Sequence, residues 1–154
     1  MTTQAFITRR QVVWAGAGLA ASTVVCPALG QTNELEAAVA AYAAGKTVTA
    51  GKVKLEVAEL VDNGNVVPIT VSVDSPMTAT MHVTAIAVFN EKNPQRDVVK
   101  FTLGPRYGRA SVSTRIRLAT TQKLVAVAQM SDGTFWSHTV DVIVTLAACI
   151  ESEA

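Results

Sequence analysis

The strongest constraint on the fold of this chain is an alternation of apolar and polar residues that recurs between residues 52 and 146. Successive side chains of a β-strand point to opposite faces, so a period of two marks half-buried strands. The segments that show it are 52–57, 67–74, 111–118 and 135–146. Turn-forming residues separate them, as in Asp62-Asn63-Gly64-Asn65 and Ser131-Asp132-Gly133-Thr134. About seven short strands with such turns predict an all-β protein with an immunoglobulin-like β-sandwich.

One predicted strand, Thr80 to Asn90, is apolar on both faces rather than on one. Such a strand lies at the centre of a sheet and is covered on both sides, either by its own chain or by a partner. We therefore expect a central strand there, whose faces are candidates for a subunit interface. Pro68 has no N–H to donate to a neighbouring strand, so the strand that contains it begins there or lies at an edge.

A helix is predicted before the strands. Thr32 or Asn33 can cap its first amide groups, and Leu35, Val39 and Tyr42 recur at a helical spacing. A glycine at position 45 supplies the stop. We expect this amphipathic helix to cover one edge or face of the sheet.

The N-terminal segment carries a processing signal. Arg9 and Arg10 precede a weakly apolar run of small residues, as in exported proteins that use the twin-arginine route. Ala28-Leu29-Gly30 places small residues at the −3 and −1 positions of a cleavage site. We expect residues 1–30 to be a twin-arginine signal peptide, with the mature protein beginning at Gln31 in the periplasm.

The same run is too short and too rich in glycine and alanine for a stable membrane anchor, which needs about 20 strongly apolar residues. A lipoprotein interpretation of Cys26 is weaker than cleavage, because Val24-Val25 lacks the small residue that lipid attachment prefers. Cys26 is therefore expected to leave with the signal peptide.

The second cysteine, Cys149, is then the only one in an exported chain, so no intrachain disulfide can form. An unpaired thiol in an oxidising compartment indicates an intermolecular partner or a reactive role, although an incidental terminal thiol is the plainer alternative. We predict a sandwich domain over residues 31–146 and a mobile cysteine-bearing arm over residues 147–154. Leu146 is expected to be the last packed residue.

Charge excludes one class of partner. The chain has 13 basic and 12 acidic side chains, and cleavage removes Arg9 and Arg10, which leaves 13 − 2 = 11 basic against 12 acidic groups. A nearly neutral protein lacks the basic excess that nucleic-acid binding needs.

Neither metal binding nor catalysis has a clear motif. His82 and His138 do not cluster with the cysteine at a metal-ligand spacing, so we expect no metal and no cofactor. His138 with Asp141 and a serine would need the geometry of a catalytic triad, which spacing alone does not supply. Arg115 and Arg117 share a strand face and suit an anion, but such alternation usually marks a solvated face. We therefore expect no catalytic residue among them.

Several longer segments of the sequence resemble those of a known family. They are Asn63-Gly64-Asn65-Val66-Val67-Pro68-Ile69-Thr70-Val71-Ser72-Val73-Asp74-Ser75-Pro76-Met77, Phe89-Asn90-Glu91-Lys92-Asn93-Pro94, Gly108-Arg109-Ala110-Ser111-Val112-Ser113-Thr114-Arg115-Ile116-Arg117-Leu118-Ala119 and Ala128-Gln129-Met130-Ser131-Asp132-Gly133. Together with the leader they resemble SoxY, the sulfur-carrier subunit of a periplasmic thiosulfate-oxidising system.

The resemblance implies an immunoglobulin-like carrier that forms a heterodimer with SoxZ and binds sulfur intermediates covalently on Cys149. It also implies three partner enzymes: a haem-containing enzyme that conjugates thiosulfate, a hydrolase that releases sulfate, and a sulfane dehydrogenase. The carrier itself would not be the catalyst.

The tail departs from the Gly-Gly-Cys-Gly-Gly arm of that family. Ala147-Ala148 precede the cysteine and Ile150-Glu151-Ser152-Glu153-Ala154 follow it. Side chains restrict an arm that glycine would leave free, and two carboxylates disfavour the nucleophilic thiolate. Two alternatives follow: a divergent SoxY-like subunit that no longer carries sulfur, or an unrelated exported sandwich whose cysteine forms an intermolecular disulfide.

Overall fold

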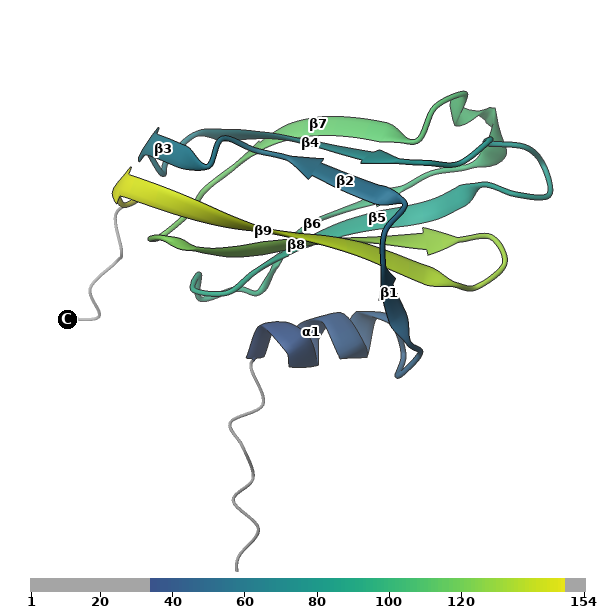
Figure 1. The fold of residues 1–154 in the computed structure, drawn as a ribbon, viewed down its shortest axis with the longest axis horizontal. Helices are drawn as coiled ribbons and strands as arrows, with labels where there is room; N and C mark the ends of the chain where they lie inside the picture. Colours follow the sequence, from purple (N-terminus) through teal and green to yellow (C-terminus); the bar gives the residue numbers. More distant parts are fainter. Residues whose placement is uncertain (1–33, 149–154) are drawn as a thin grey trace, which may run out of the picture. The chain divides into compact units, whose positions relative to one another are not determined.

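A computed structural model describes residues 34–148 of the chain. These residues form one α-helix, nine strands and a short 3-10 turn, shown in Figure 1. The elements are α1 (Glu34–Tyr42), β1 (Val48–Ala50), β2 (Val53–Glu56), β3 (Leu60–Asn63), β4 (Val67–Val73), β5 (Val83–Asn90), β6 (Asp97–Thr102), η2 (Pro105–Tyr107), β7 (Ser111–Ile116), β8 (Gln122–Met130) and β9 (Phe135–Leu146).

The strands form two sheets that lie face to face (Figure 1). A six-stranded sheet has the order β1-β9-β8-β5-β6, and β3 also pairs with β9. A three-stranded sheet has the order β2-β4-β7. The predicted immunoglobulin-like β-sandwich is confirmed. The long alternating segment that ends at Leu146 is β9, which pairs with β8 from Phe135 to Val142.

The main core lies between the sheets and consists mostly of valine, isoleucine and leucine. These β-branched and aliphatic side chains suit a pleated surface. Its fully buried members include Val67, Val71, Ile86, Val88, Leu118, Leu124 and Val142. Burying each one stabilises the fold by about 1.5–3 kcal/mol relative to exposure, as an upper estimate.

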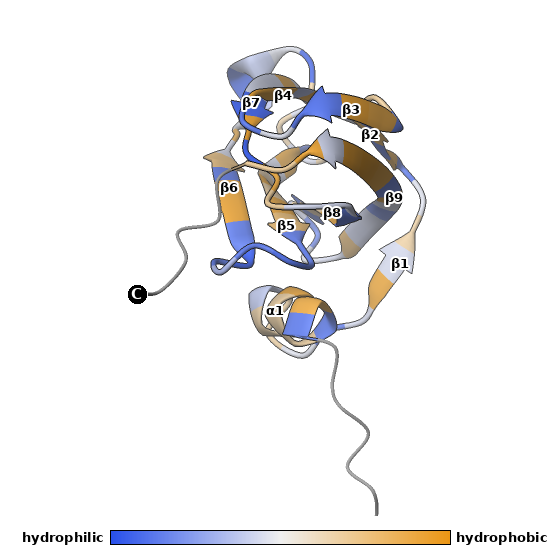
Figure 2. Cartoon of the chain, turned by 90° about the vertical axis from the view of Figure 1, so that its left-hand side faces the viewer, coloured by the Kyte–Doolittle hydropathy of each residue, from blue (hydrophilic) through white to orange (hydrophobic). Residues whose placement is uncertain are grey.

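Helix α1 covers the outer face of the six-stranded sheet, below the strands in Figure 2. Leu35 and Ala43 of this segment pack with Phe89, Val125 and Phe135 in a second apolar cluster. Strand β5 is therefore covered on one face by the other sheet and on the other face by α1. The expectation of a central strand is confirmed, but the expectation that its faces form a subunit interface is wrong, because the chain itself buries them.

Two details of the sheets bear on the sequence analysis. Strand β4 begins at Val67, one residue before Pro68, and its pairing with β2 ends at Thr70, so the proline interrupts no ladder on that side. Strand β3 was not predicted. It is four residues long and crosses from the smaller sheet to pair in parallel with the end of β9. Within residues 34–148, no helix has the length and apolarity needed to cross a membrane.

Candidate functional site

The functional candidate lies where the chain leaves the sandwich. Strand β9 ends at Leu146, beside the start of β8 and the end of β5, because Gln122 pairs with Val142 and Asn90 with Leu124. We call this region the tail end and define it as residues 62–66, 90–96, 117–121 and 146–148. The predicted site residues Cys149, Arg9 and Arg10 lie outside the described residues, as does Cys26. The structure therefore describes the exit of the tail up to Ala148.

The turn after β3 holds the last residue of β9. The Asn63 side-chain oxygen accepts a hydrogen bond of 2.9 Å from the Asn65 backbone N–H, which is how asparagine stabilises a turn. The Gly64 N–H then donates to the Leu146 carbonyl at 2.8 Å. One residue earlier, the Thr145 hydroxyl donates to the Asp62 carbonyl at 3.1 Å. This turn therefore fastens the end of β9 from one side.

The loop after β7 continues the attachment beyond the strand. The Leu118 N–H donates to the Gly64 carbonyl at 2.8 Å, and the Ala148 N–H donates to the Leu118 carbonyl at 3.2 Å. Leu118 is fully buried and Ala148 is only 8% exposed, whereas Leu146 is 67% exposed. The expectation that packing ends at Leu146 is wrong: the chain folds back and buries Ala148, the residue immediately before Cys149.

Position 64 needs a glycine because of space. A Cβ atom built there would collide with the Leu118 carbonyl oxygen and lie 3.0 Å from the Ala148 nitrogen. Gly64 is not among the residues with a positive φ, so backbone conformation is not the reason for it. The turn is predictable from its residues but this close approach is not, since the residues next to Gly64 in the sequence do not show which distant loop it contacts.

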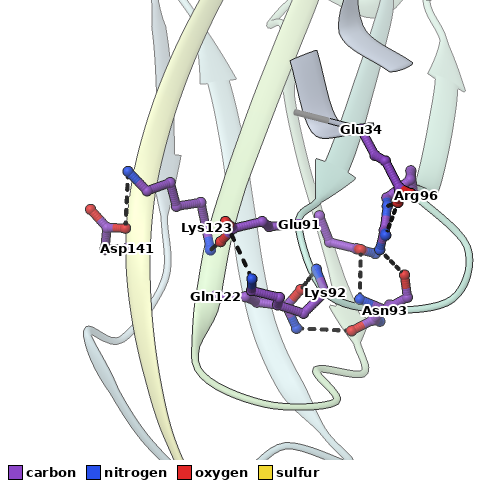
Figure 3. A network of polar contacts seen from close by, with 9 residues as sticks. Glu34, Glu91, Lys92, Asn93, Arg96, Gln122, Lys123 and Asp141 are labelled. Carbon is purple, nitrogen blue, oxygen red and sulfur yellow. Dashed lines mark hydrogen bonds and ion pairs between the residues drawn. The ribbon is translucent and has the colours of Figure 1, made fainter. Parts of the chain in front are cut away.

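Asn93 organises the neighbouring loop, as Figure 3 shows in part. Its side-chain N–H donates to the Arg117 carbonyl at 2.8 Å, and its side-chain oxygen accepts from the Ala119 N–H at 2.9 Å. The same oxygen accepts from the Gln122 side-chain N–H at 2.8 Å. Asn93 thus fixes the backbone on both sides of Leu118, which in turn holds Ala148.

Two amide side chains at this end are buried. Asn90 is 1% exposed and Gln122 is 3% exposed. Asn90 donates to the Gln95 carbonyl at 2.9 Å, and Gln122 accepts from the Lys92 N–H at 2.8 Å. Buried polar groups are tolerated when their hydrogen bonds are made, and a complete network favours a single arrangement. The tail end is therefore a defined surface rather than a set of independent loops.

Most charged side chains near this network are paired on the surface. Lys123 lies 3.9 Å from Asp141, and both are exposed (Figure 3), so the pair contributes little. Arg96 donates from its Nε to a Glu34 carboxylate oxygen at 3.0 Å, which joins the start of α1 to this loop. Hydrogen bonding to Arg96 and its positive charge lower the pKa of the Glu34 carboxyl.

The other residues singled out from the sequence do not assemble into a site. The His138 Nδ1 atom accepts a hydrogen bond of 3.1 Å from the Leu55 N–H, which ties β9 to β2. Arg115 and Arg117 are exposed, as expected for a solvated face. Among residues 34–148, no group of three or more histidine, cysteine, aspartate or glutamate side chains could hold a metal ion. The His82 backbone N–H donates to the Ser131 hydroxyl oxygen at 3.1 Å, and the His82 ring Nδ1 lies 3.1 Å from the nearby Thr78 carbonyl oxygen.

Large apolar side chains are exposed close to the exit. Leu60 is 59% exposed and Ile143 is 54% exposed, and the two residues are partners in the register of β3 and β9. Paired residues of neighbouring strands present their side chains on the same face. Leu146 and Val66 are exposed near the same end, but Leu146 lies on the opposite face of β9 from Ile143, because successive side chains of a strand alternate.

Known proteins with a similar sequence or structure share this architecture, and the matched part of the chain includes the predicted cysteine. The profile of the family described as "Sulfur oxidation protein SoxY" matches residues 38–149, an interval that ends on Cys149. The chain belongs to the SoxY family. This membership supports a sulfur-carrier role in sulfur oxidation, as the resemblance implied.

Two solved structures illustrate the likeness of the fold. The sulfur carrier protein SoxY from Chlorobium limicola f thiosulfatophilum is 30% identical, with a TM-score of 0.58 over 73% of this SoxY-family chain and 96% of that one. The superoxide reductase (neelaredoxin) from Ignicoccus hospitalis is 20% identical, with a TM-score of 0.54 over 61% of this chain and 80% of that one. The second likeness concerns the fold alone. No curated protein matches the chain.

Proposed function

We propose that this SoxY-family protein carries sulfur covalently on Cys149 and presents it to partner enzymes. The observation that carries the proposal is the family match, which ends on Cys149. The position of Ala148 supports it, because the residue that precedes Cys149 lies at one end of the sandwich, close in sequence to the exposed Leu146. Thiolate is the form of cysteine that attacks sulfur.

The proposed reaction begins with the Cys149 thiolate and the sulfane sulfur of thiosulfate. Their S–S bond forms with the loss of two electrons, which a haem-containing partner would accept. Hydrolysis of the sulfonate group would then release sulfate and leave a sulfane sulfur on Cys149, which a dehydrogenase partner would oxidise. The carrier supplies the attachment point, and the partners supply the catalysis.

Mass spectrometry of the protein purified from thiosulfate-grown cells tests this role. We expect sulfur adducts on Cys149, and Cys149→Ser should abolish thiosulfate oxidation while its circular dichroism spectrum stays unchanged. An unmodified thiol in active cells would instead favour a divergent subunit that no longer carries sulfur. A disulfide-linked dimer without adducts would favour an exported binding protein of another kind.

We propose that the protein works in the periplasm after twin-arginine export. The support is the arginine pair at positions 9 and 10 and the cleavage signal before Gln31. Replacing Arg9 and Arg10 by lysine should leave the precursor inside the cell, and N-terminal sequencing of the exported wild type should begin near Gln31. Unchanged accumulation of the variant in the periplasm would argue against this route.

For the partner subunit, a SoxZ-like chain, we propose the surface formed by Leu60 and Ile143. These side chains are large, apolar and more than half exposed, and they lie side by side beside the tail exit. The double substitution Leu60→Asp with Ile143→Asp should prevent co-purification with the partner. Tyr107→Asp is the control, because Tyr107 is 59% exposed but lies in η2, away from the tail end. Equal loss in both variants would rule out this surface.

A further inference from the structure

Two adjacent alanines before Cys149 differ sharply in their surroundings. Ala147 is exposed, whereas Ala148 is 8% exposed and donates its N–H to the Leu118 carbonyl. The two residues are chemically identical and one position apart, so the difference comes from the surface on which the chain is laid down. That surface consists of Gly64 and Leu118.

The attachment of Ala148 is supported from a distance. Gly64 accepts from the Leu118 N–H and donates to the Leu146 carbonyl, both at 2.8 Å. Asn93 binds the residues before and after Leu118, and the buried Gln122 binds Asn93. These hydrogen bonds, joined through the backbone of residues 117–119, connect the buried Gln122 at the start of β8 to the residue that precedes the cysteine.

We propose that Ala148 is the fixed pivot of the sulfur-carrying arm, and that Gly64 and Asn93 are the residues that position it. This inference rests on the proposed function of Cys149. If the chain were free from Leu146, three residues would let the sulfur travel about 10 Å, at about 3.3–3.6 Å per residue. With Ala148 held, the reach is that of a single residue and its side chain.

A short reach has a consequence for the partners. The enzyme that loads or unloads Cys149 must contact the tail end itself, because the thiol cannot extend into a deep channel while Ala148 stays bound. The loops 62–66, 90–96 and 117–121 then belong to the surface that every partner enzyme meets. A partner with a deep site would need Ala148 to be released first.

Amide hydrogen exchange and ¹⁵N relaxation of the exported protein test the pivot directly. The amide of residue 148 should be protected and rigid in the wild type, with an order parameter near 0.85, a typical value for rigid backbone. Ala148→Gly removes the buried methyl group. Ala147→Gly adds the same backbone freedom at an exposed position and is the matched control.

We expect protection at position 148 to fall about fourfold further in Ala148→Gly than in Ala147→Gly, the factor that corresponds to one buried methyl group. Gly64→Ala should expose the amide of residue 148 without changing the exchange of amides in β5 and β8. Equal protection in the two glycine variants would overturn the proposal, as would an unprotected amide at position 148 in the wild type.

These measurements need no sulfur, so their outcome is separate from the proposed carrier role. Absence of adducts on Cys149 with a protected Ala148 would refute the carrier function and leave the pivot intact. A second measurement uses Asn93→Ala, which should loosen residue 148 although the Asn93 side chain bonds to Arg117, Ala119 and Gln122 rather than to Ala148. Unchanged relaxation at residue 148 in Asn93→Ala would exclude Asn93 as a positioning residue.

Discussion

The two ends of the sandwich are closed in different ways. At the far end, which contains Met77, Gly108 and Gly133, the chain turns with left-handed backbone conformations, at φ values of 50°, 72° and 82°. At the tail end, the described residues have no positive φ, and side-chain amides connect loops that are far apart in sequence. Glycine serves conformation at the far end, whereas Gly64 at the tail end serves close packing.

Because of this difference, the effect of a substitution should extend further through the structure at one end than at the other. The hairpin at Ser131–Thr134 is closed by Asp132, whose carboxylate accepts from the N–H and the hydroxyl of Thr134, two residues away. Asn93, in contrast, bonds residues 24 and 29 positions away in the chain. The effect of a substitution in the far-end turn should therefore stay close to that turn. A substitution at the tail end should also affect residues 146–148, where the chain leaves the sandwich.

Among the substitutions that test this difference between the two ends, we expect Leu118→Ala to have the largest effect. Leu118 is fully buried, and removing its side chain should lower the free energy of unfolding by about 2–5 kcal/mol. Leu103→Ala is the control, because Leu103 is 7% exposed and follows β6 at the far end. Urea unfolding should show a similar loss for both, but only Leu118→Ala should speed amide exchange at residue 148.

Asn93→Ala should give the next largest effect. It leaves the buried Gln122 amide and two backbone groups without their partner, which costs about 1–3 kcal/mol. Asn65→Ala is the control, since Asn65 is exposed and its side chain bonds only to the nearby Asn63. Thermal unfolding that showed equal losses for the two variants would contradict a network that depends on Asn93.

Glycine substitutions at the far end should have smaller effects that depend on conformation. Gly108→Ala should lower the free energy of unfolding by about 1 kcal/mol, because Gly108 has a φ of 72° that side chains disfavour. Gly104→Ala should be neutral or stabilising by about 0.4–1 kcal/mol, since its φ is −141° and an added Cβ meets no atom within 4 Å. A destabilised Gly104→Ala variant in urea unfolding would mean that backbone conformation does not explain this end.

We expect the smallest effect from protonation of the Asp132 carboxyl at acid pH. Hydrogen bonds from the Thr134 hydroxyl and backbone N–H lower the pKa of the Asp132 carboxyl. Because the pKa is lower in the folded state, the resulting stabilisation is full above the ordinary aspartate pKa and is lost as pH falls through the lowered value. NMR titration should show the lowered pKa, and Thr134→Val should raise it toward the ordinary value without affecting residue 148.

The elements with a local signal could be predicted from sequence. Alternation revealed β4 and β9, and the apolar run from Thr80 to Asn90 indicated the central position of β5. Strand β3 lacked such a signal, because Leu60-Val61 is too short a pattern and its partner is the distant end of β9. Short strands of this kind are defined by tertiary pairing rather than by propensity.

The site was predictable only in part for the same reason. Its turn residues, Asn63 and Gly64, were recognised from composition, and the family resemblance indicated Cys149. The burial of Ala148 depends on Leu118, which is 30 residues earlier in the chain, and no spacing rule connects them. Long-range hydrogen bonds from side-chain amides to backbone groups leave no periodic trace in a sequence.

The pairing of β9 on both edges also determines how the protein responds to a mechanical load. A partner that pulls on the tail applies force along β9, while the hydrogen bonds to β8 run across the strand. Such bonds are loaded in shear and must break together, unlike the bonds of a strand that is peeled from one end. The long last strand is held by β8 on one side and by β1 and β3 on the other, so it should resist a pull on the tail without leaving the sheet.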